Sequence, residues 1–445
     1  MVSLGRVKLD PVENADAPAG WWEKAFLGFI MLGQQSAFTG VNRILQGREN
    51  DPTVEASDPA NVFFVIVTLV GMAILFRLRP HLIARIARLS PLILLTCIFT
   101  VASSLWSDAK TLVLKRALTH FGTMMVALYL PTRLGFDGAI RLVARSIVVA
   151  AILSLLAGIF IPNLGIMHSP GNYGRWRGIF SFKNPLAQVM GIGVILQYYI
   201  MLTSKKKIFT AIFAGLEALL VVIAGSATVL GLIILASAGI AIYTILKRGG
   251  IFIPIVVICL APLAALVAIV IMLEPNLLFG LIGRDSTLTG RTELWALAWQ
   301  AAQDRPFFGH GFQGFWDSGD LVVGEIWSTI GWLAPNAHNG LLEVALELGA
   351  VGVLLVGSLL LQALFRILSL LTIQGAANQM CVSVIVLICV VIHSGTEAVL
   401  LRQTDISWFM IMLMSLSEAQ TKQSARAAPV ERTLNILARA RPSSA

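Results

Sequence analysis

The chain has 445 residues, of which 57% are hydrophobic and only 13% are charged, and its mean hydropathy is +0.81. Soluble domains carry about 25% charged residues, so this composition excludes a soluble globular protein. The apolar stretches run for about 20 residues without alternation, which indicates spanning helices rather than a membrane barrel. The net charge of +9 could suggest nucleic-acid binding, but its distribution along the chain is typical of membrane topology.

The sequence predicts an all-α polytopic membrane protein with about 12 transmembrane helices. The predicted spans are 22–40, 61–77, 90–106, 112–130, 140–162, 184–203, 208–225, 227–246, 251–273, 341–365, 380–400 and 404–419. The first is the weakest, because Gln34, Gln35 and Ser36 interrupt it, and the last is short. The four cysteines all fall in apolar segments, so we expect no disulfide and no metal site at them.

The distribution of positive charge predicts the orientation of these spans. An even number of spans places both termini on one side, and Lys and Arg are enriched in cytoplasmic segments. With cytoplasmic termini, the inner segments hold 21 of the 33 Lys and Arg residues. The predicted organisation is a cytoplasmic segment 1–21, nine spans in 22–273, a periplasmic loop 274–340, three spans in 341–419 and a cytoplasmic tail 420–445.

The loop 274–340 is the largest outer segment, and long loops are often functional. Its five tryptophans indicate that it is folded, and a helix is predicted at 290–304, followed by Pro306. Arg291 falls in the first turn of this helix, where the helix dipole disfavours a cation. A phosphate held between Arg291 and the free N–H groups would explain it, and so would a surface arginine on an amphipathic helix.

Lys and Arg are disfavoured in outer segments, so the presence of other cations there indicates a structural or functional role. Arg175, Arg177 and Lys183 stand just before a span, and Lys115 and Arg116 lie near the outer end of another. Contact with lipid head groups is the alternative that we favour for Lys115 alone. For Arg116, Arg175 and Arg177 we favour a site for an anion.

His338 precedes the tenth predicted span, where Asn339 can cap the helix. The imidazole side chain suits proton transfer near neutral pH, although such a residue is often only solvated or part of a cap. Glu343 and Glu347 follow on one face of the span and could orient a base, pair with an arginine or line a cavity. Three further ionisable residues in apolar segments are interpreted as structural partners: Glu217, His393 and Glu397.

The order of these motifs resembles the O-antigen ligase and polymerase superfamily, and most closely its exopolysaccharide-polymerase branch. The matching stretches are Gly290-Arg-Thr-Glu-Leu-Trp295, Asp304-Arg-Pro-Phe-Phe-Gly-His-Gly-Phe312, Ala337-His-Asn-Gly-Leu-Leu-Glu343, Glu347-Leu-Gly349, Arg175-Trp-Arg-Gly178 with Lys183-Asn184, and Leu105-Trp-Ser107. One departure is Phe182, where many relatives carry a histidine.

The resemblance implies a glycosyltransferase of the bacterial inner membrane that needs no metal or other cofactor. Its donor would be an oligosaccharide on undecaprenyl pyrophosphate, and its partners would include membrane lipid and the flippase and chain-length or export proteins of the pathway. His338 would be the catalytic base. The substrate-binding residues would be Arg116, Arg175, Arg177, Lys183, Arg291, Glu343 and Glu347. The absence of a nucleotide-binding loop and of the common metal-site and hydrolase motifs from the sequence agrees with such a donor.

Three other interpretations stay open at this point. A ligase would use the same donor and differ only in transferring polysaccharide to lipid A core. A transporter or flippase for lipid-linked glycans should have duplicated halves and charges at mid-membrane depth, and only Glu217 is clearly so placed. A non-catalytic assembly subunit would tolerate the loss of His338 and of the outer arginines.

The charge distribution gives the first testable prediction. Reporter fusions at the C-terminal tail should be active with cytoplasmic reporters, and fusions at residue 310 should be active with periplasmic reporters, because the cations gather on the inner side. The opposite pattern would overturn the assignment of His338 and the outer arginines to the periplasmic face.

Overall fold

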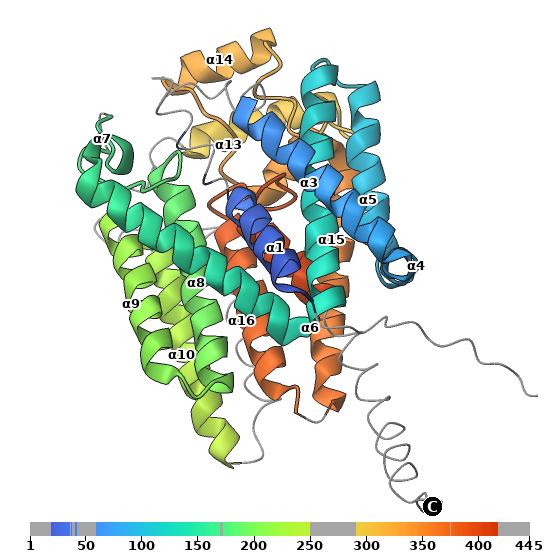
Figure 1. Cartoon of the computed structure of the whole chain (residues 1–445). Helices are drawn as coiled ribbons and strands as arrows, with labels where there is room; N and C mark the ends of the chain where they lie inside the picture. Colours follow the sequence, from blue (N-terminus) through green and yellow to red (C-terminus); the bar gives the residue numbers. More distant parts are fainter. Residues whose placement is uncertain are drawn as a thin grey trace, which may run out of the picture.

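The computed structural model describes residues 19–35, 37, 41, 59–169, 172–249, 291–373 and 375–416, and this part of the chain is helical (Figure 1). Six of its helices are long and apolar enough to cross a membrane, or seven if the bent pair α3 and α4 is one span. The predicted all-α polytopic membrane protein is therefore confirmed. The count of 12 spans is not confirmed, and the predicted span 251–273 lies outside the described residues.

The helices fall close to the predicted spans. The first half contains α1 (Trp21–Gln34), α3 (Pro59–Leu78), α4 (Pro80–Leu89), α5 (Pro91–Ala102), η2 (Ser103–Leu105), α6 (Lys110–Phe160), α7 (Pro162–Gly165), α8 (Lys183–Thr203), α9 (Lys207–Ala224) and α10 (Ala227–Gly249). The second half contains α13 (Arg291–Asp304), α14 (Leu321–Ile330), α15 (Gly340–Ser369), η4 (Leu370–Thr372), α16 (Ala377–Ser394) and a last helix, Ile406–Leu416.

The fourth and fifth predicted spans are the two arms of one bent helix, α6. The bend falls at Gly135, whose φ of 69° and ψ of 174° are not helical, a few residues after Pro131. Proline lacks a backbone N–H and commonly bends helices. The glutamines that interrupt the first span hold α1 against both arms, since Gln34 accepts from the Thr123 hydroxyl and Gln35 donates to Ser146 at 2.8 Å. These polar residues therefore join helices rather than end a span.

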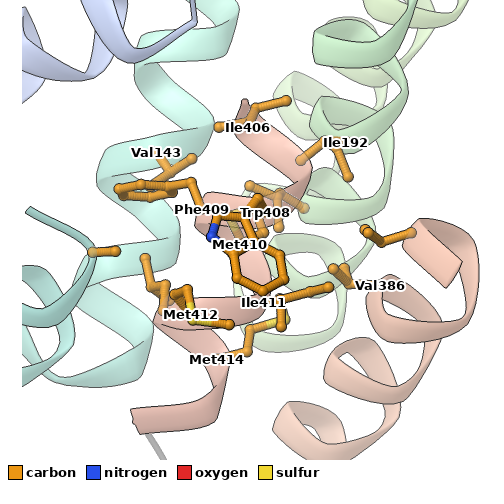
Figure 2. Packing of buried hydrophobic residues seen from close by; sticks show 14 of the residues in the cluster. Val143, Ile192, Val386, Ile406, Trp408, Phe409, Met410, Ile411, Met412 and Met414 are labelled. Carbon is orange, nitrogen blue, oxygen red and sulfur yellow. The ribbon is translucent and has the colours of Figure 1, made fainter. Parts of the chain in front are cut away.

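The last helix, Ile406–Leu416, is buried in the middle of the bundle (Figure 2). Its Trp408, Phe409 and Met412 are at most 1% exposed. Figure 2 shows this helix packed among Val143 of α6, Ile192 of α8 and Val386 of α16. A helix with apolar residues on every side is buried in a protein core or in lipid, and here other helices surround it. The short final span thus fixes the loop that precedes it, residues 395–405.

A buried carboxylate ties three segments together at the end of the bundle that the charge distribution predicts to be cytoplasmic. Glu23 of α1 is fully buried and forms ion pairs with Arg133 of α6 at 3.0 Å and with Arg79 at 3.3 Å. Tyr129 donates a further hydrogen bond to Glu23 at 2.7 Å. A buried charge is tolerated when it is paired and hydrogen-bonded in this way. Some of the inner arginines therefore hold the bundle, and the side that they face stays a prediction.

At the opposite end, α15 is broken at Gly349, whose φ is 62°. The break frees backbone groups on both sides, and unpaired backbone groups are costly in a membrane. The segment 306–311 supplies their partners, because α15 carbonyls accept from this segment and α15 amides donate to it. The four hydrogen bonds are His310 N to Leu346 O, Gly311 N to Glu347 O, Ala350 N to Pro306 O and Val351 N to Phe307 O. The loop and the broken helix therefore form one rigid unit under α13 and α14 (Figure 1).

This arrangement predicts that Gly309→Ala destabilises the protein. Gly309 has a φ of 64°, and an added Cβ would lie 2.3 Å from the carbonyl carbon of Glu347. The left-handed conformation alone costs an alanine about 1–2 kcal/mol. Gly319→Ala is the matched control, because Gly319 has a φ of 73° but open space around it. Thermal unfolding in detergent should show a clearly larger loss for Gly309→Ala, and equal losses would contradict the interlocked packing.

Candidate active site

His338 lies in the loop that leads into α15, in a left-handed backbone conformation with a φ of 48°. The Asn336 side chain accepts from the His338 amide at 2.8 Å, and Asn339 caps α15 through the Leu342 amide at 3.1 Å, which confirms the predicted cap. A residue other than glycine keeps this conformation only when its surroundings impose it. The contacts of the loop therefore decide where the imidazole points.

The carboxylate of Glu397 gathers three segments around His338. Glu397 lies in the loop 395–405, and its Oε2 is 2.8 Å from Nδ1 of His338. Its Oε1 accepts from Nη2 of Arg291 at 3.1 Å and from Nδ2 of Asn184 at 2.9 Å. Arg291 begins α13 and Asn184 lies in the first turn of α8. These four residues, Asn184, Arg291, His338 and Glu397, are named here the Glu397 cluster.

The geometry fixes which nitrogen of His338 is available for chemistry. An ionised carboxylate can only accept hydrogen bonds, so Nδ1 of His338 carries the proton that points to Glu397. Nε2 on the other side of the neutral ring is then a free acceptor, and within the described chain no group bonds to it. A carboxylate that orients an imidazole in this way is the arrangement of a general base and its orienting group.

Glu397 is the charged partner at any working pH. Burial alone would raise the pKa of this carboxyl, but His338, Arg291 and His393 lower it to about 2. A carboxylate that faces a cation and accepts several hydrogen bonds favours its ionised form. The Glu397 cluster therefore contains a permanent negative charge next to His338.

Of the predicted site residues, the structure brings His338 and Arg291 together and places Lys183 beside them. The predicted helix 290–304 is confirmed as α13, and Arg291 uses its guanidinium on Glu397 and on the Thr396 carbonyl at 2.5 Å. Lys183 precedes Asn184 at the start of α8, so its backbone adjoins the Glu397 cluster. Arg291 thus holds the carboxylate, which the phosphate interpretation did not anticipate.

The other three predicted arginines lie in different surroundings. Arg175 is exposed, and its guanidinium lies against Gly225 at the turn between α9 and α10. Arg116 is buried and pairs with Asp317 at 2.5 Å and with the Gln313 carbonyl. Arg177 is fully buried and donates to the carbonyls of residues 163 and 164, both at 2.9 Å. The structure therefore brings neither Arg116 nor Arg177 to a surface where a substrate could bind.

Glu343 and Glu347 are also placed behind the site rather than in it. Both side chains are buried, with 2% and 3% of their surface exposed. Glu343 accepts from the Ala337 amide at 2.7 Å and from the Trp316 indole at 3.2 Å. The sequence predicts that both glutamates bind substrate, but their burial leaves no face for that contact. Glu343 supports the His338 loop instead.

Two residues of the site, Glu397 and Arg402, were not among the predicted site residues. Glu397 was interpreted as a structural partner, although an ionisable residue in an apolar segment is a signal for a charged partner and for function. Arg402 lies in the same loop as Glu397, and its Nη1 is 3.7 Å from Oε1 of Glu343. No sequence pattern pairs Arg402 with Glu343, which is 59 positions away.

A small cavity adjoins the Glu397 cluster. It has a volume of about 20 Å³ and lies between α8, α10, α16 and the last helix. His393, Gln188 and Ser407 are its polar lining, and His393 is one helical turn before Glu397. Its other walls are apolar: Gly191, Ile192, Ile195, Val229, Leu232, Ile233, Cys389 and Val390.

In the described part of the chain, no group of three His, Cys, Asp or Glu residues is arranged to hold a metal ion.

Replacing Glu397 should change the acid stability of the protein. The lowered pKa of Glu397 contributes stability that is complete above the unfolded-state pKa of about 4.3 and is lost as the pH falls toward about 2. The unfolding temperature of the unaltered protein should therefore fall in acid below about pH 5. Glu397→Gln should be less stable at neutral pH and should lack this part of the decline.

The matched control is Glu325→Gln, because Glu325 is exposed on α14. Its unfolding temperature should follow that of the unaltered protein at each pH. A Glu397→Gln variant with an unchanged acid profile would show that the carboxylate is not held by His338 and Arg291.

Comparison with known proteins shows which sequences the chain resembles. Residues 186–357 match the family model described as O-Antigen ligase. The chain is also 25% identical over 283 residues to the Exopolysaccharide production protein ExoQ of Rhizobium meliloti (strain 1021), covering 60% of this chain and 63% of that protein. The chain thus spans less than two thirds of the length of this relative. Residues 186–357 are therefore similar to the O-antigen ligase family, and the predicted resemblance to this superfamily and its exopolysaccharide branch is confirmed.

Proposed function

We propose that the chain is a polymerase that joins oligosaccharide repeat units carried on undecaprenyl pyrophosphate into an exopolysaccharide. The observation that carries the proposal is the 2.8 Å contact between Nδ1 of His338 and Glu397, which leaves Nε2 of His338 free. The similarity to an exopolysaccharide production protein supports the product class. The reaction would take place at the periplasmic face of the inner membrane, with both termini in the cytoplasm.

In this mechanism His338 is the general base. Nε2 takes the proton of an acceptor sugar hydroxyl while the hydroxyl oxygen attacks the anomeric carbon of the donor. The bond between that carbon and the pyrophosphate oxygen breaks, and undecaprenyl pyrophosphate leaves with the bonding electrons. Glu397 stays ionised and stabilises the imidazolium that forms, as in other pairs of a base and its orienting carboxylate. The donor supplies the energy, so the scheme needs no metal or nucleotide.

The leaving pyrophosphate requires cations near the site. Arg175 is the best candidate among the predicted arginines, because its guanidinium is exposed and has no ion pair within the described residues. Its planar fork suits phosphate oxygens. Lys183 stands beside the Glu397 cluster and is a second candidate. Arg291 would contribute through its charge while it holds Glu397.

Membrane lipid and the flippase and chain-length or export proteins of such a pathway are the partners that this reaction would require.

A ligase that transfers polysaccharide to lipid A core is the second candidate, favoured by the description of the matching family. The two reactions share the donor and the base, and they differ only in the acceptor. Purified protein in lipid should be given undecaprenyl-pyrophosphate oligosaccharide with or without lipid A core. Longer lipid-linked products support the polymerase, a glycosylated core supports the ligase, and movement of intact donor across the bilayer without new bonds would support a flippase.

In this assay His338→Ala should lower the turnover rate while donor binding changes little. A general base contributes about 100- to 10,000-fold to the rate, because the proton moves only during reaction. Activity of the unaltered protein should rise between about pH 6 and 9 if neutral His338 is the base, and fall if an imidazolium holds the pyrophosphate. His338→Gln with normal turnover across this range would remove His338 from the mechanism.

A further inference from the structure

The peptide group just before His338 is held from both sides. The amide of Ala337 donates to Oε2 of Glu343 at 2.7 Å, and the carbonyl of Ala337 accepts from the Trp295 indole at 2.8 Å. Ala337 itself is fully buried. These two contacts determine the orientation of the chain where it enters the left-handed conformation of His338.

Glu343 also contacts the loop that carries Glu397. Oε1 of Glu343 lies 3.7 Å from Nη1 of Arg402, and Arg402 and Glu397 both belong to the loop 395–405. The Trp316 indole donates to Oε2 of Glu343 at 3.2 Å, from the loop between α13 and α14. One buried carboxylate in the first turn of α15 therefore joins the loop of the base to the loop of its orienting partner.

We propose that Glu343 is a positioning residue, which keeps the side chains of His338 and Glu397 at the distance and orientation that proton transfer requires. This inference rests on the proposed function. Hydrogen bonds to a charged acceptor are stronger than neutral ones, and a surrounding of low polarity strengthens them further. The negative charge of Glu343 is balanced by Arg402. The base and its partner come from loops far apart in the sequence, and Glu343 is a buried group that contacts both loops.

The polymerisation assay with purified protein tests this role. Glu343→Ala should lower kcat about tenfold or more while KM for the donor changes little, because the altered contact acts on the reacting base and not on binding. Glu343→Gln should recover part of the rate, since its amide oxygen can still accept from the Ala337 amide. A Glu343→Ala variant that is folded and turns over normally would overturn the proposal.

A double-mutant cycle separates positioning from general destabilisation. In the His338→Ala background, Glu343→Ala should cause no further loss of kcat, because residues that act as one unit are not additive. Two independent losses that multiply would contradict a role through His338. Glu217→Gln is the matched control, since it alters another fully buried carboxylate on α9, and its rate per folded molecule should equal that of the unaltered protein.

A second readout needs no substrate and so does not depend on the proposed function. Diethyl pyrocarbonate modifies free imidazole nitrogens, and mass spectrometry can follow its reaction at His338 alone. Glu343→Ala should change the modification rate of His338 several-fold, with the rates at exposed His81 and His168 as internal references. An unchanged rate at His338 overturns the positioning role. The modification rate at His338 could change although the unaltered protein fails to lengthen the donor oligosaccharide. That result would overturn only the proposed reaction.

Discussion

The ionised carboxylate of Glu397 is the group on which the candidate site depends. A charge that leaves water is stable only when it is paired and hydrogen-bonded, and the helix ends around Glu397 provide those partners. Arg291 and Asn184 occupy one oxygen, and His338 faces the other. The need to pair this charge therefore brings the starts of α8 and α13 to the loop before α15. The same contacts hold the imidazole with Nε2 free, so the stability of the fold at this end and the geometry of the base have one cause.

The broken helix α15 explains how the loop of His338 stays fixed on a lipid-facing scaffold. The segment 306–311 pairs with the backbone groups that the break at Gly349 frees, so the outer loops are anchored to a span by main-chain hydrogen bonds. The buried last helix anchors the loop 395–405 from the other side (Figure 2). The proposed base and its partner thus lie on loops, but each loop begins or ends at a rigid element, which is what proton transfer over a fixed distance requires.

Local patterns in the sequence predicted the local structure, and the long-range pairs could not be predicted in the same way. Apolar runs located the spans, the helix predicted at 290–304 is α13, and Asn339 was identified as a helix cap. A charged residue in a sequence carries no information on its partner, so Arg177 could not be distinguished from Arg175. The first donates to carbonyls of α7, and the second lies exposed near the turn between α9 and α10. For the same reason, the pairing of Glu397 with His338 became visible only in the fold.

The outer arginines fall into two groups, those that form an ion pair with a carboxylate and those that do not. Arg291 is matched by Glu397, Arg116 by Asp317, and Arg402 by Glu343, so each of these arginines has a carboxylate partner. Such pairs organise loops but attract an anionic donor only weakly. In the proposed reaction, the positive charge that faces the pyrophosphate would come from cations without a carboxylate partner. Arg175 is the one among the predicted arginines that is both exposed and without an ion pair in the described chain. In the proposed reaction, the paired arginines would organise the loops, and the exposed Arg175 side chain would be the one that could follow the pyrophosphate as it leaves.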